Sequence, residues 1–182
     1  HQSRHLPDKL IAWDGICFTV PDSWEIDTLE ASHLLIGNDS TAQLEIKWTR
    51  TPRRLNPADF IKKFIRQIQR QLDITIQEAP TPHDFRHETD PLGFFFYTWT
   101  GHGASGCGAF IFCSHCRRLS LVRFFKTNHP DRLSCQILSS FQDHPAGQTT
   151  PWAVFGLALR LPGQFELKAF EFKPGEFRIE LT

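Results

Sequence analysis

The sequence predicts an α+β fold in which an antiparallel β-sheet is flanked by two helices, followed by the opening strands of a second such unit. Several stretches alternate apolar and polar residues between turn residues, and two others repeat apolar residues at intervals of three and four. A pattern of twelve residues also recurs near the end of the chain. With 182 residues, 40% of them hydrophobic and 22% charged, the chain is long enough to bury a substantial core.

The first third of the chain predicts strands. Residues 11–20 alternate in polarity and stop at Pro21, which indicates a strand followed by a turn. Residues 34–36 and 42–48 lie on either side of Gly-Asn-Asp-Ser, a sequence typical of a β-hairpin turn. We therefore expect one long strand and then a hairpin before the first helix.

The first helix is predicted over residues 57–73. Asn56 is a favoured N-cap residue, and Pro57 suits the first helical position. The apolar residues that follow recur at helical spacing: Phe60, Ile61, Phe64, Ile65, Ile68 and Leu72. This pattern indicates an amphipathic helix with one buried face.

The second half of the complete unit predicts three more strands and a closing helix. Residues 93–100, 108–113 and 119–126 are rich in aromatic and β-branched side chains, which favour strands. Residues 131–141 again place apolar side chains at helical spacing. The order strands, helix, strands, helix is typical of an α+β domain with an antiparallel sheet.

A twelve-residue pattern occurs twice in the chain. Residues 15–26 and 156–167 align at a constant offset of 141 without a gap. The matched positions include turn and aromatic residues: Gly15 with Gly156, Pro21 with Pro162, and Trp24 with Phe165. The alternative, two unrelated strands that each end at a proline, has to explain twelve collinear positions. We therefore favour a repeat.

The repeat divides the chain into three expected parts: a complete domain at residues 8–142, a linker at residues 143–151 and an incomplete second copy at residues 152–182. The linker reads Asp-His-Pro-Ala-Gly-Gln-Thr-Thr-Pro, a composition typical of a connection between domains. The second copy contains strands whose apolar side chains lack the remainder of a domain. We expect these side chains either to dock on the first domain or to pack poorly: Leu157, Leu159 and Leu161.

Four features of the chain resemble the PsbP-like family. They are the strand opening G-I-C-F-T-V-P-D-S-W at residues 15–24, the long first helix, the three-stranded meander and a last helix that ends in I-L-S-S-F. That family includes the extrinsic photosystem II subunit, a Ran-binding protein and many bacterial relatives. The resemblance covers the complete copy and the start of the second one. It implies an α/β/α sandwich and, for the better understood members, binding of another protein. It carries over no catalytic residue, because the matched positions are structural.

Gly101, Gly103 and Gly106 spell G-x-G-x-x-G, the sequence of a dinucleotide-binding turn. Such a turn has to open a helix, whose N-terminus meets the pyrophosphate. Here the next residues are Cys-Gly-Ala-Phe-Ile-Phe-Cys, which predict a strand, and the acidic residue expected about twenty positions further on is missing. The glycines therefore predict a hairpin turn, and we expect no dinucleotide.

Cys113 and Cys116 form a C-x-x-C pair between two predicted strands. Zinc needs three or four thiolate or imidazole ligands, so this pair would need a distant His to complete a site. A redox pair favours a helix N-terminus, which the predicted turn does not provide. The alternative is two small residues in a β-turn. A metal- or thiol-dependent function centred on this pair is the second interpretation of the chain.

Charge is distributed unevenly along the first half of the chain. Residues 1–46 contain eight acids and two bases, whereas residues 47–70 contain eight bases and one acid. On the predicted helix, basic residues recur every four positions and form a stripe that attracts an acidic partner. The candidate contacts for a protein partner are Trp48, Arg53, Arg54, Lys62, Arg66 and Arg70. The alternative is a solvated helix face that the acids of residues 1–46 neutralise.

These features favour a non-catalytic module that binds a protein, with no cofactor. The chain has no G-x-S-x-G, P-loop or H-E-x-x-H sequence, and an enzyme with a site assembled from distant residues is the third interpretation. A formal net charge of zero argues against nucleic acid, and no apolar run is long enough to cross a membrane. Five cysteines favour reduced thiols and a cytoplasmic location. Because the chain begins with His and contains no Met, we expect the natural N-terminus to lie further upstream.

Overall fold

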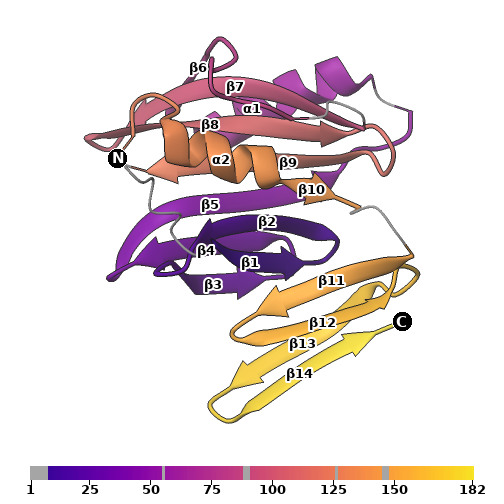
Figure 1. Cartoon of the computed structure of the whole chain (residues 1–182). Helices are drawn as coiled ribbons and strands as arrows, with labels where there is room; N and C mark the ends of the chain where they lie inside the picture. Colours follow the sequence, from indigo (N-terminus) through magenta and orange to yellow (C-terminus); the bar gives the residue numbers. More distant parts are fainter. Residues whose placement is uncertain (1–7, 55, 88–90, 126, 145–147) are drawn as a thin grey trace.

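The computed structural model describes residues 8–54, 56–87, 91–125, 127–144 and 148–182. Within these ranges the chain forms mostly antiparallel sheets together with two helices, an α+β arrangement (Figure 1). Outside the described residues lie residues 55 and 88–90 of the predicted domain and residue 126 of its last predicted strand. Residues 145–147 of the predicted linker also lie outside them.

The largest sheet has the strand order β3-β4-β5-β9-β8-β7-β6, and all neighbouring strands in it are antiparallel. The predicted hairpin is confirmed as β4–β5 and the predicted meander as β7–β8–β9. The sequence did not predict β3, whose side chains are mostly exposed or half-buried, or the short edge strand β6. The bounds are β3 Glu25–Glu30, β4 His33–Asn38, β5 Thr41–Arg50, β6 Thr75–Glu78, β7 Leu92–Gly101, β8 Ala104–Cys113 and β9 Arg118–Phe125.

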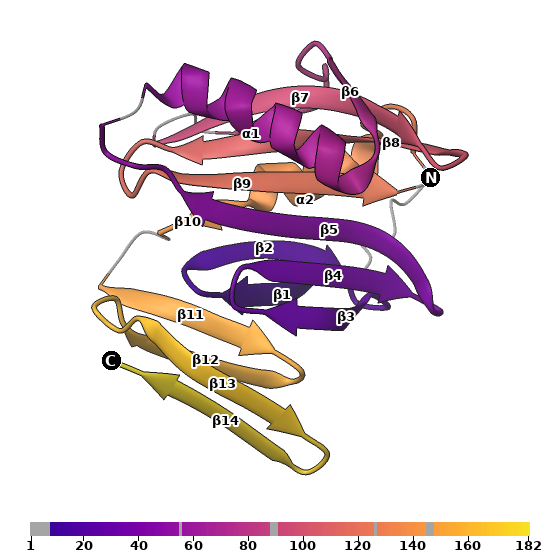
Figure 2. The same cartoon turned by 180° about the vertical axis from the view of Figure 1, so that it is seen from behind.

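The first helix, α1 (Pro57–Leu72), confirms the predicted helix and lies across one face of this sheet (Figure 2). The Asn56 side chain accepts a hydrogen bond of 2.9 Å from the backbone N–H of Ala58, which caps the helix. Asp73 ends it in the left-handed conformation. The helix packs its apolar stripe on a cluster from the underlying strands: Tyr97, Trp99, Phe110, Leu119 and Leu121.

The second helix, α2 (Arg132–Ser140), packs against β2 on the opposite side of the large sheet (Figure 1). Asp131 caps it by accepting a hydrogen bond of 2.8 Å from the backbone N–H of Ser134. Beyond its end, the Phe141 ring stacks on Phe18 of β2 with centroids 6.1 Å apart. The main core therefore lies between the large sheet and a layer made of α2 and the N-terminal strands.

That layer contains a second sheet with the strand order β10-β2-β1-β11-β12. The predicted strand over residues 11–20 is wrong as a single strand, because Asp14 and Gly15 adopt positive φ angles of 50° and 84° and turn the chain into the β1–β2 hairpin. Asp-Gly is a strong hairpin signal that the apolar alternation concealed. The bounds are β1 Asp8–Trp13, β2 Ile16–Pro21, β10 Gln142–Asp143, β11 Thr149–Val154 and β12 Leu157–Pro162.

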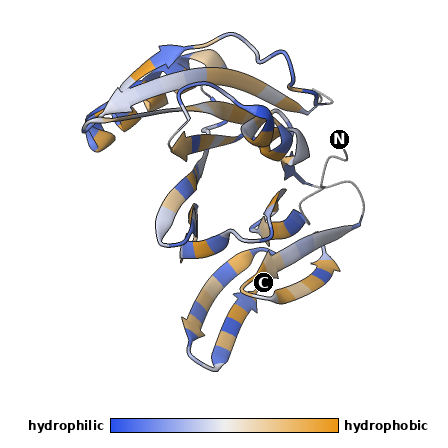
Figure 3. Cartoon of the chain, turned by 60° about the vertical axis from the view of Figure 1, so that its left-hand side comes forward, coloured by the Kyte–Doolittle hydropathy of each residue, from blue (hydrophilic) through white to orange (hydrophobic). Residues whose placement is uncertain are grey.

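The last hairpin consists of β13 (Leu167–Lys173) and β14 (Glu176–Leu181) and forms a separate two-stranded sheet. Near the C-terminus, hydrophobic and hydrophilic residues alternate along the strands (Figure 3). The Trp13 ring joins this hairpin to the core, since it lies 5.3 Å from Trp152 and 5.1 Å from Phe170, both edge-on. Leu159 and Leu161 pack half-buried against the main core, so β12 does not leave these side chains without cover.

The G-x-G-x-x-G sequence is a hairpin turn, as predicted. His102 and Gly103 have positive φ angles of 52° and 71° and connect β7 to β8. Gly106 lies within β8, where an added Cβ would lie 2.5 Å from the indole nitrogen of Trp99. Close packing of Trp99 therefore accounts for that glycine.

No helix in the described part of the chain is both long and apolar enough to cross a membrane.

Candidate metal centre

Four potential metal ligands meet at one end of the large sheet. Cys113 ends β8, Cys116 lies in the turn before β9, Asp143 belongs to β10, and His144 follows it directly. One donor atom from each of the four side chains lies within 4.8 Å of the others. Cys113 is buried, Cys116 is half-buried and His144 is exposed on one side. We call this group the Cys-Asp-His cluster.

Local backbone structure places the two cysteines together. The backbone N–H of Arg117 donates a hydrogen bond of 2.8 Å to the carbonyl of Cys113, and Arg117 itself has a φ of 60°. This compact turn reverses the chain between β8 and β9. The predicted turn is therefore present, and it holds the C-x-x-C pair at the end of the sheet.

The other two ligands arrive from a distant part of the sequence. Asp143 pairs with Ile16 in the β10–β2 ladder, and the backbone N–H of His144 donates a hydrogen bond of 3.1 Å to the carbonyl of Gly15. The β1–β2 turn thus fixes the segment that follows α2. The distant His that the cysteine pair requires is His144.

A buried arginine orients the carboxylate of the cluster. One guanidinium nitrogen of Arg118 lies 3.0 Å from Oδ1 of Asp143, and another lies 3.4 Å from Oδ2 of Asp14. The thiol of Cys116 donates to the other Asp143 oxygen, Oδ2, at 3.4 Å. Arg118 is only 2% exposed, so its charge needs these partners. Oδ1 is therefore held by Arg118 and by Nδ1 of His144, which lies 3.0 Å away, and Oδ2 is held by the Cys116 thiol.

Without a metal, only one of the two cysteines in the cluster takes its metal-binding form, and Cys116 and His144 keep their protons until an ion displaces them. A hydrogen bond from Cys116 and a further one from His144 lower the pKa of Cys113 despite its burial. The same contact with Cys113, together with burial, raises the pKa of Cys116. Hydrogen bonds to Asp143 and then to Cys113 raise the pKa of His144 to about 9. The sulfur of Cys113 thus takes the thiolate form, which is the form that binds metals.

The donor set suits zinc. Two sulfur atoms, one imidazole nitrogen and one carboxylate oxygen make four ligands of the kinds that zinc prefers. Ligand atoms bound to one zinc lie roughly 3.3–3.8 Å apart, from bond lengths of about 2.0–2.3 Å in a tetrahedron. The separations of up to 4.8 Å in the cluster are therefore within about one ångström of a bound geometry, a change that side-chain rotation can supply.

The predicted basic residues lie on the surface and are not part of this cluster. Arg53 and Arg54 are exposed before α1, and the side chains of Lys62, Arg66 and Arg70 are exposed along it. Among the described residues, none of these five forms an ion pair. The acids of residues 1–46 instead pair elsewhere, for example Glu25 with Lys9, Glu45 with Arg123 and Asp14 with Arg118.

Trp48 is wrong as a surface contact. Its side chain is only 6% exposed, and its indole N–H donates a hydrogen bond of 3.1 Å to Asp14. It lies on the same side of β5 as the buried Leu44 and Ile46, because side chains two residues apart in a strand face the same way. That parity was visible in the sequence and predicts a core position.

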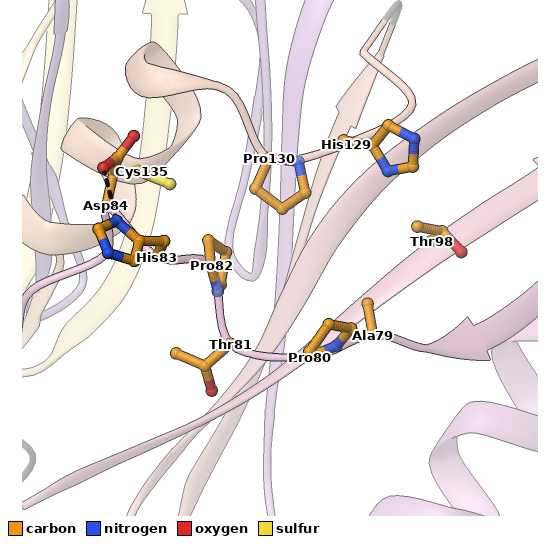
Figure 4. A pocket seen from close by; sticks show the side chains of 10 residues that line it. All are labelled: Ala79, Pro80, Thr81, Pro82, His83, Asp84, Thr98, His129, Pro130 and Cys135. Atoms are coloured by element: carbon orange, nitrogen blue, oxygen red, sulfur yellow. Dashed lines mark hydrogen bonds and ion pairs between the residues drawn. The ribbon is translucent and has the colours of Figure 1, made fainter.

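A small pocket of about 360 Å³ lies at the loops around residues 79–84 and 129–130 (Figure 4). His83 and Asp84 form an exposed pair at 3.3 Å on its rim. Cys135 also lines the pocket, but burial raises the pKa of its thiol, so it stays protonated. Among the described residues, no three potential metal ligands of this pocket lie close enough together to hold one ion.

No protein-family model matches the chain, and no curated protein matches it in sequence. Several solved structures are similar to it, two bacterial proteins among them. A Bacteroides thetaiotaomicron protein is 12% identical with a TM-score of 0.46, over 80% of this chain and 52% of that one. The cyanobacterial PsbP of Synechocystis is 12% identical with a TM-score of 0.45, over 79% of this chain and 97% of that one. The chain spans about half the length of the Bacteroides protein, and at these TM-scores neither similarity carries an argument about function.

Proposed function

We propose that this chain is a non-catalytic binding module and that the Cys-Asp-His cluster binds one zinc ion. The observation that carries the proposal is the convergence of four donor atoms within 4.8 Å, from two segments far apart in the sequence. Four protein ligands leave zinc no open position, as in structural rather than catalytic sites. The ion therefore joins the β8–β9 turn to the segment that follows α2.

The charge of the proposed site supports zinc. Binding of Zn²⁺ would displace the protons of Cys116 and His144. The two thiolates and one carboxylate would then exceed the charge of Zn²⁺ by one negative unit, and the guanidinium of Arg118 would compensate it. A buried site is stable only when its charges are paired in this way.

Elemental mass spectrometry tests this proposal directly. Protein purified without chelator and under reducing conditions is expected to contain about one zinc per chain, because folding assembles the site. Cys116→Ser is expected to lose it. Cys135→Ser is the matched control, since Cys135 lies outside the cluster. Protein without metal, or equal zinc in both variants, would overturn the proposal.

Protein binding through the basic face of α1 is a second candidate function. It is favoured because the basic side chains of this face are exposed and form no ion pair in the described part of the chain. The alternative, a solvated helix face without a partner, shares this exposure, and binding of a partner distinguishes the two. This surface lies on the opposite side of the large sheet from α2, so the two functions do not compete for space.

We further propose that the chain is a tandem repeat of PsbP-like units, with an incomplete second copy. Two backbone features support it. Phe155 and Gly156 have positive φ angles of 50° and 79°, as Asp14 and Gly15 have in the first hairpin. Ala12 pairs with Ala153 between β1 and β11, so residues at the offset of 141 face each other across the sheet.

The glycines of the two turns test the repeat. Gly15→Ala and Gly156→Ala are each expected to lower the free energy of unfolding by about 1 kcal/mol, because both residues adopt positive φ angles. Gly15→Ala should lower the free energy of unfolding more than Gly156→Ala does. A Cβ at position 15 would lie 3.4 Å from the Arg118 side chain, whereas a Cβ at position 156 would have no atom within 4 Å. A neutral Gly156→Ala would contradict the equivalence of the turns.

A further inference from the structure

The helix α1 leaves part of the underlying sheet face uncovered. A groove of about 510 Å³ lies between the N-terminal half of α1 and the strands β6, β7 and β8. Ile61 and Ile65 form its helix side, and Phe95 and Phe112 lie on its floor. The lining is therefore largely apolar, although the groove is open to solvent.

Phe95 is the most exposed aromatic side chain of this groove. It lies on the α1 side of β7, in line with the buried Tyr97 and Trp99, yet it is 50% exposed because α1 does not cover it. Single exposed apolar residues are ordinary on protein surfaces. A half-exposed phenylalanine at the bottom of an apolar groove is instead typical of a site that receives a side chain from a partner.

Positive charge borders the groove on one side. Lys62 lines it, and Arg66 and Arg70 follow at intervals of about one helical turn. These three side chains are exposed and, within the described residues, unpaired; we call them the basic stripe. At a rise of about 1.5 Å per residue the stripe extends over roughly 12 Å. Glu78 lies on the β6 side, so negative charge on a ligand is directed toward the helix.

We propose that the groove and the basic stripe together bind an acidic peptide segment that carries one bulky apolar side chain. The apolar side chain fills the groove against Phe95, and the acidic residues lie along Lys62, Arg66 and Arg70. A small amphiphile with a single carboxylate would use only Lys62, whereas an extended acidic chain matches the whole length of the stripe. This inference rests on the second candidate function and names the class of its partner.

Two fluorescein-labelled peptides test the inference, one rich in glutamate with a central tryptophan and the other with alanine in place of that tryptophan. The tryptophan peptide is expected to bind about tenfold more tightly, as for a single anchor residue. Phe95→Glu should remove this difference by placing a charge in the groove. Phe177→Glu is the matched control, since Phe177 is similarly exposed on β14 outside the groove. Circular dichroism confirms that each variant is folded.

Charge reversal separates the groove from the basic stripe. Arg66→Glu with Arg70→Glu should weaken both peptides at least about tenfold and slow their association, because charge complementarity acts on both alike. Arg160→Glu, at an exposed position of β12, should change neither. If the two peptides bind equally and both lose binding on charge reversal, the groove inference is wrong, but protein binding through the basic face of α1 is still supported. No binding of either peptide, or preferential binding of anionic phospholipid vesicles, would overturn both.

Discussion

The Cys-Asp-His cluster and the basic stripe contain charged groups in opposite settings. The cluster gathers side chains from two distant segments around the buried Arg118. The stripe places its charges on one helix, in water. Two charges 4 Å apart interact by about 1 kcal/mol in water, the setting of the stripe. They interact by about 4 kcal/mol at the effective dielectric constant that describes charge pairs in proteins, buried pairs included. An arginine therefore supports the fold in the cluster, whereas the arginines of the stripe leave the stability of the fold almost unaffected.

The largest difference between the two regions should follow the loss of an arginine. Arg118→Met is expected to lower the free energy of unfolding by about 3–5 kcal/mol, because the buried Asp143 and its neighbour Asp14 would both lose the guanidinium that pairs with them. Arg66→Met, the matched change on α1, should stay within about 0.5 kcal/mol of the wild type. Urea unfolding measures both values. Similar losses at the two sites would contradict the comparison.

Zinc should stabilise the cluster and leave the stripe untouched. At a free concentration about 100 times the dissociation constant, zinc is expected to add about 2.7 kcal/mol to the free energy of unfolding. Thermal melts before and after chelation measure the change. Cys113→Ser should abolish the increment, whereas Arg66→Glu should retain it in full. An increment that survives Cys113→Ser would place the metal elsewhere.

Glu45 of β5 is a buried carboxylate outside both regions, and it makes the stability of the fold depend on pH. Burial raises the pKa of Glu45, but Arg123, Lys47 and His33 outweigh it and hold the pKa below its ordinary value of 4.5. Because the folded pKa is the lower one, this stabilisation is present above pH 4.5 and is lost as the pH falls through the folded value.

Glu45→Gln should therefore cost about 2 kcal/mol at neutral pH, and the cost should shrink below pH 4.5. Unfolding measured across this pH range checks the trend. Glu25→Gln is the control, since the pair of Glu25 with Lys9 is exposed and contributes little. A cost that does not vary with pH would show that the carboxylate charge is not responsible.

The smallest effect is expected from charge reversal on the stripe. Arg66→Glu with Arg70→Glu should change the free energy of unfolding by less than about 0.5 kcal/mol per site, because both side chains are solvated. Denaturant titration measures it. A loss of several kcal/mol would mean that the stripe is part of the folded core's support and is not a free binding surface.

Much of the fold was predictable because the responsible interactions are local. The spacing of Ile61, Ile65 and Ile68 predicts α1, and the cap at Asn56 fixes where it begins. Asp14-Gly15 carried an equally local turn signal, but the apolar alternation on both sides of it concealed the β1–β2 hairpin. The linker composition of residues 143–151 was a weaker local signal, because Asp143 lies in β10 and residues 149–151 lie in β11.

The candidate site was predictable only in part. The C-x-x-C spacing identified Cys113 and Cys116 because a short turn brings them together. Cys116 and Asp143 are 27 residues apart, and Arg118 and Asp14 are 104 apart. No sequence spacing encodes such contacts, so Asp143, His144 and Arg118 were missed as members of the site.

The sequence by itself determined the strands, the turns, the two amphipathic helices, the cysteine pair and the basic stripe, since each depends on residues within a few positions of one another. The tertiary structure decided which of them are buried and which distant side chains meet. Packing of α2 against β2 brings His144 to the cysteines, and the parity of β5 turns Trp48 into the core. Burial and long-range contact are properties of the assembled chain, because they depend on what every other element covers.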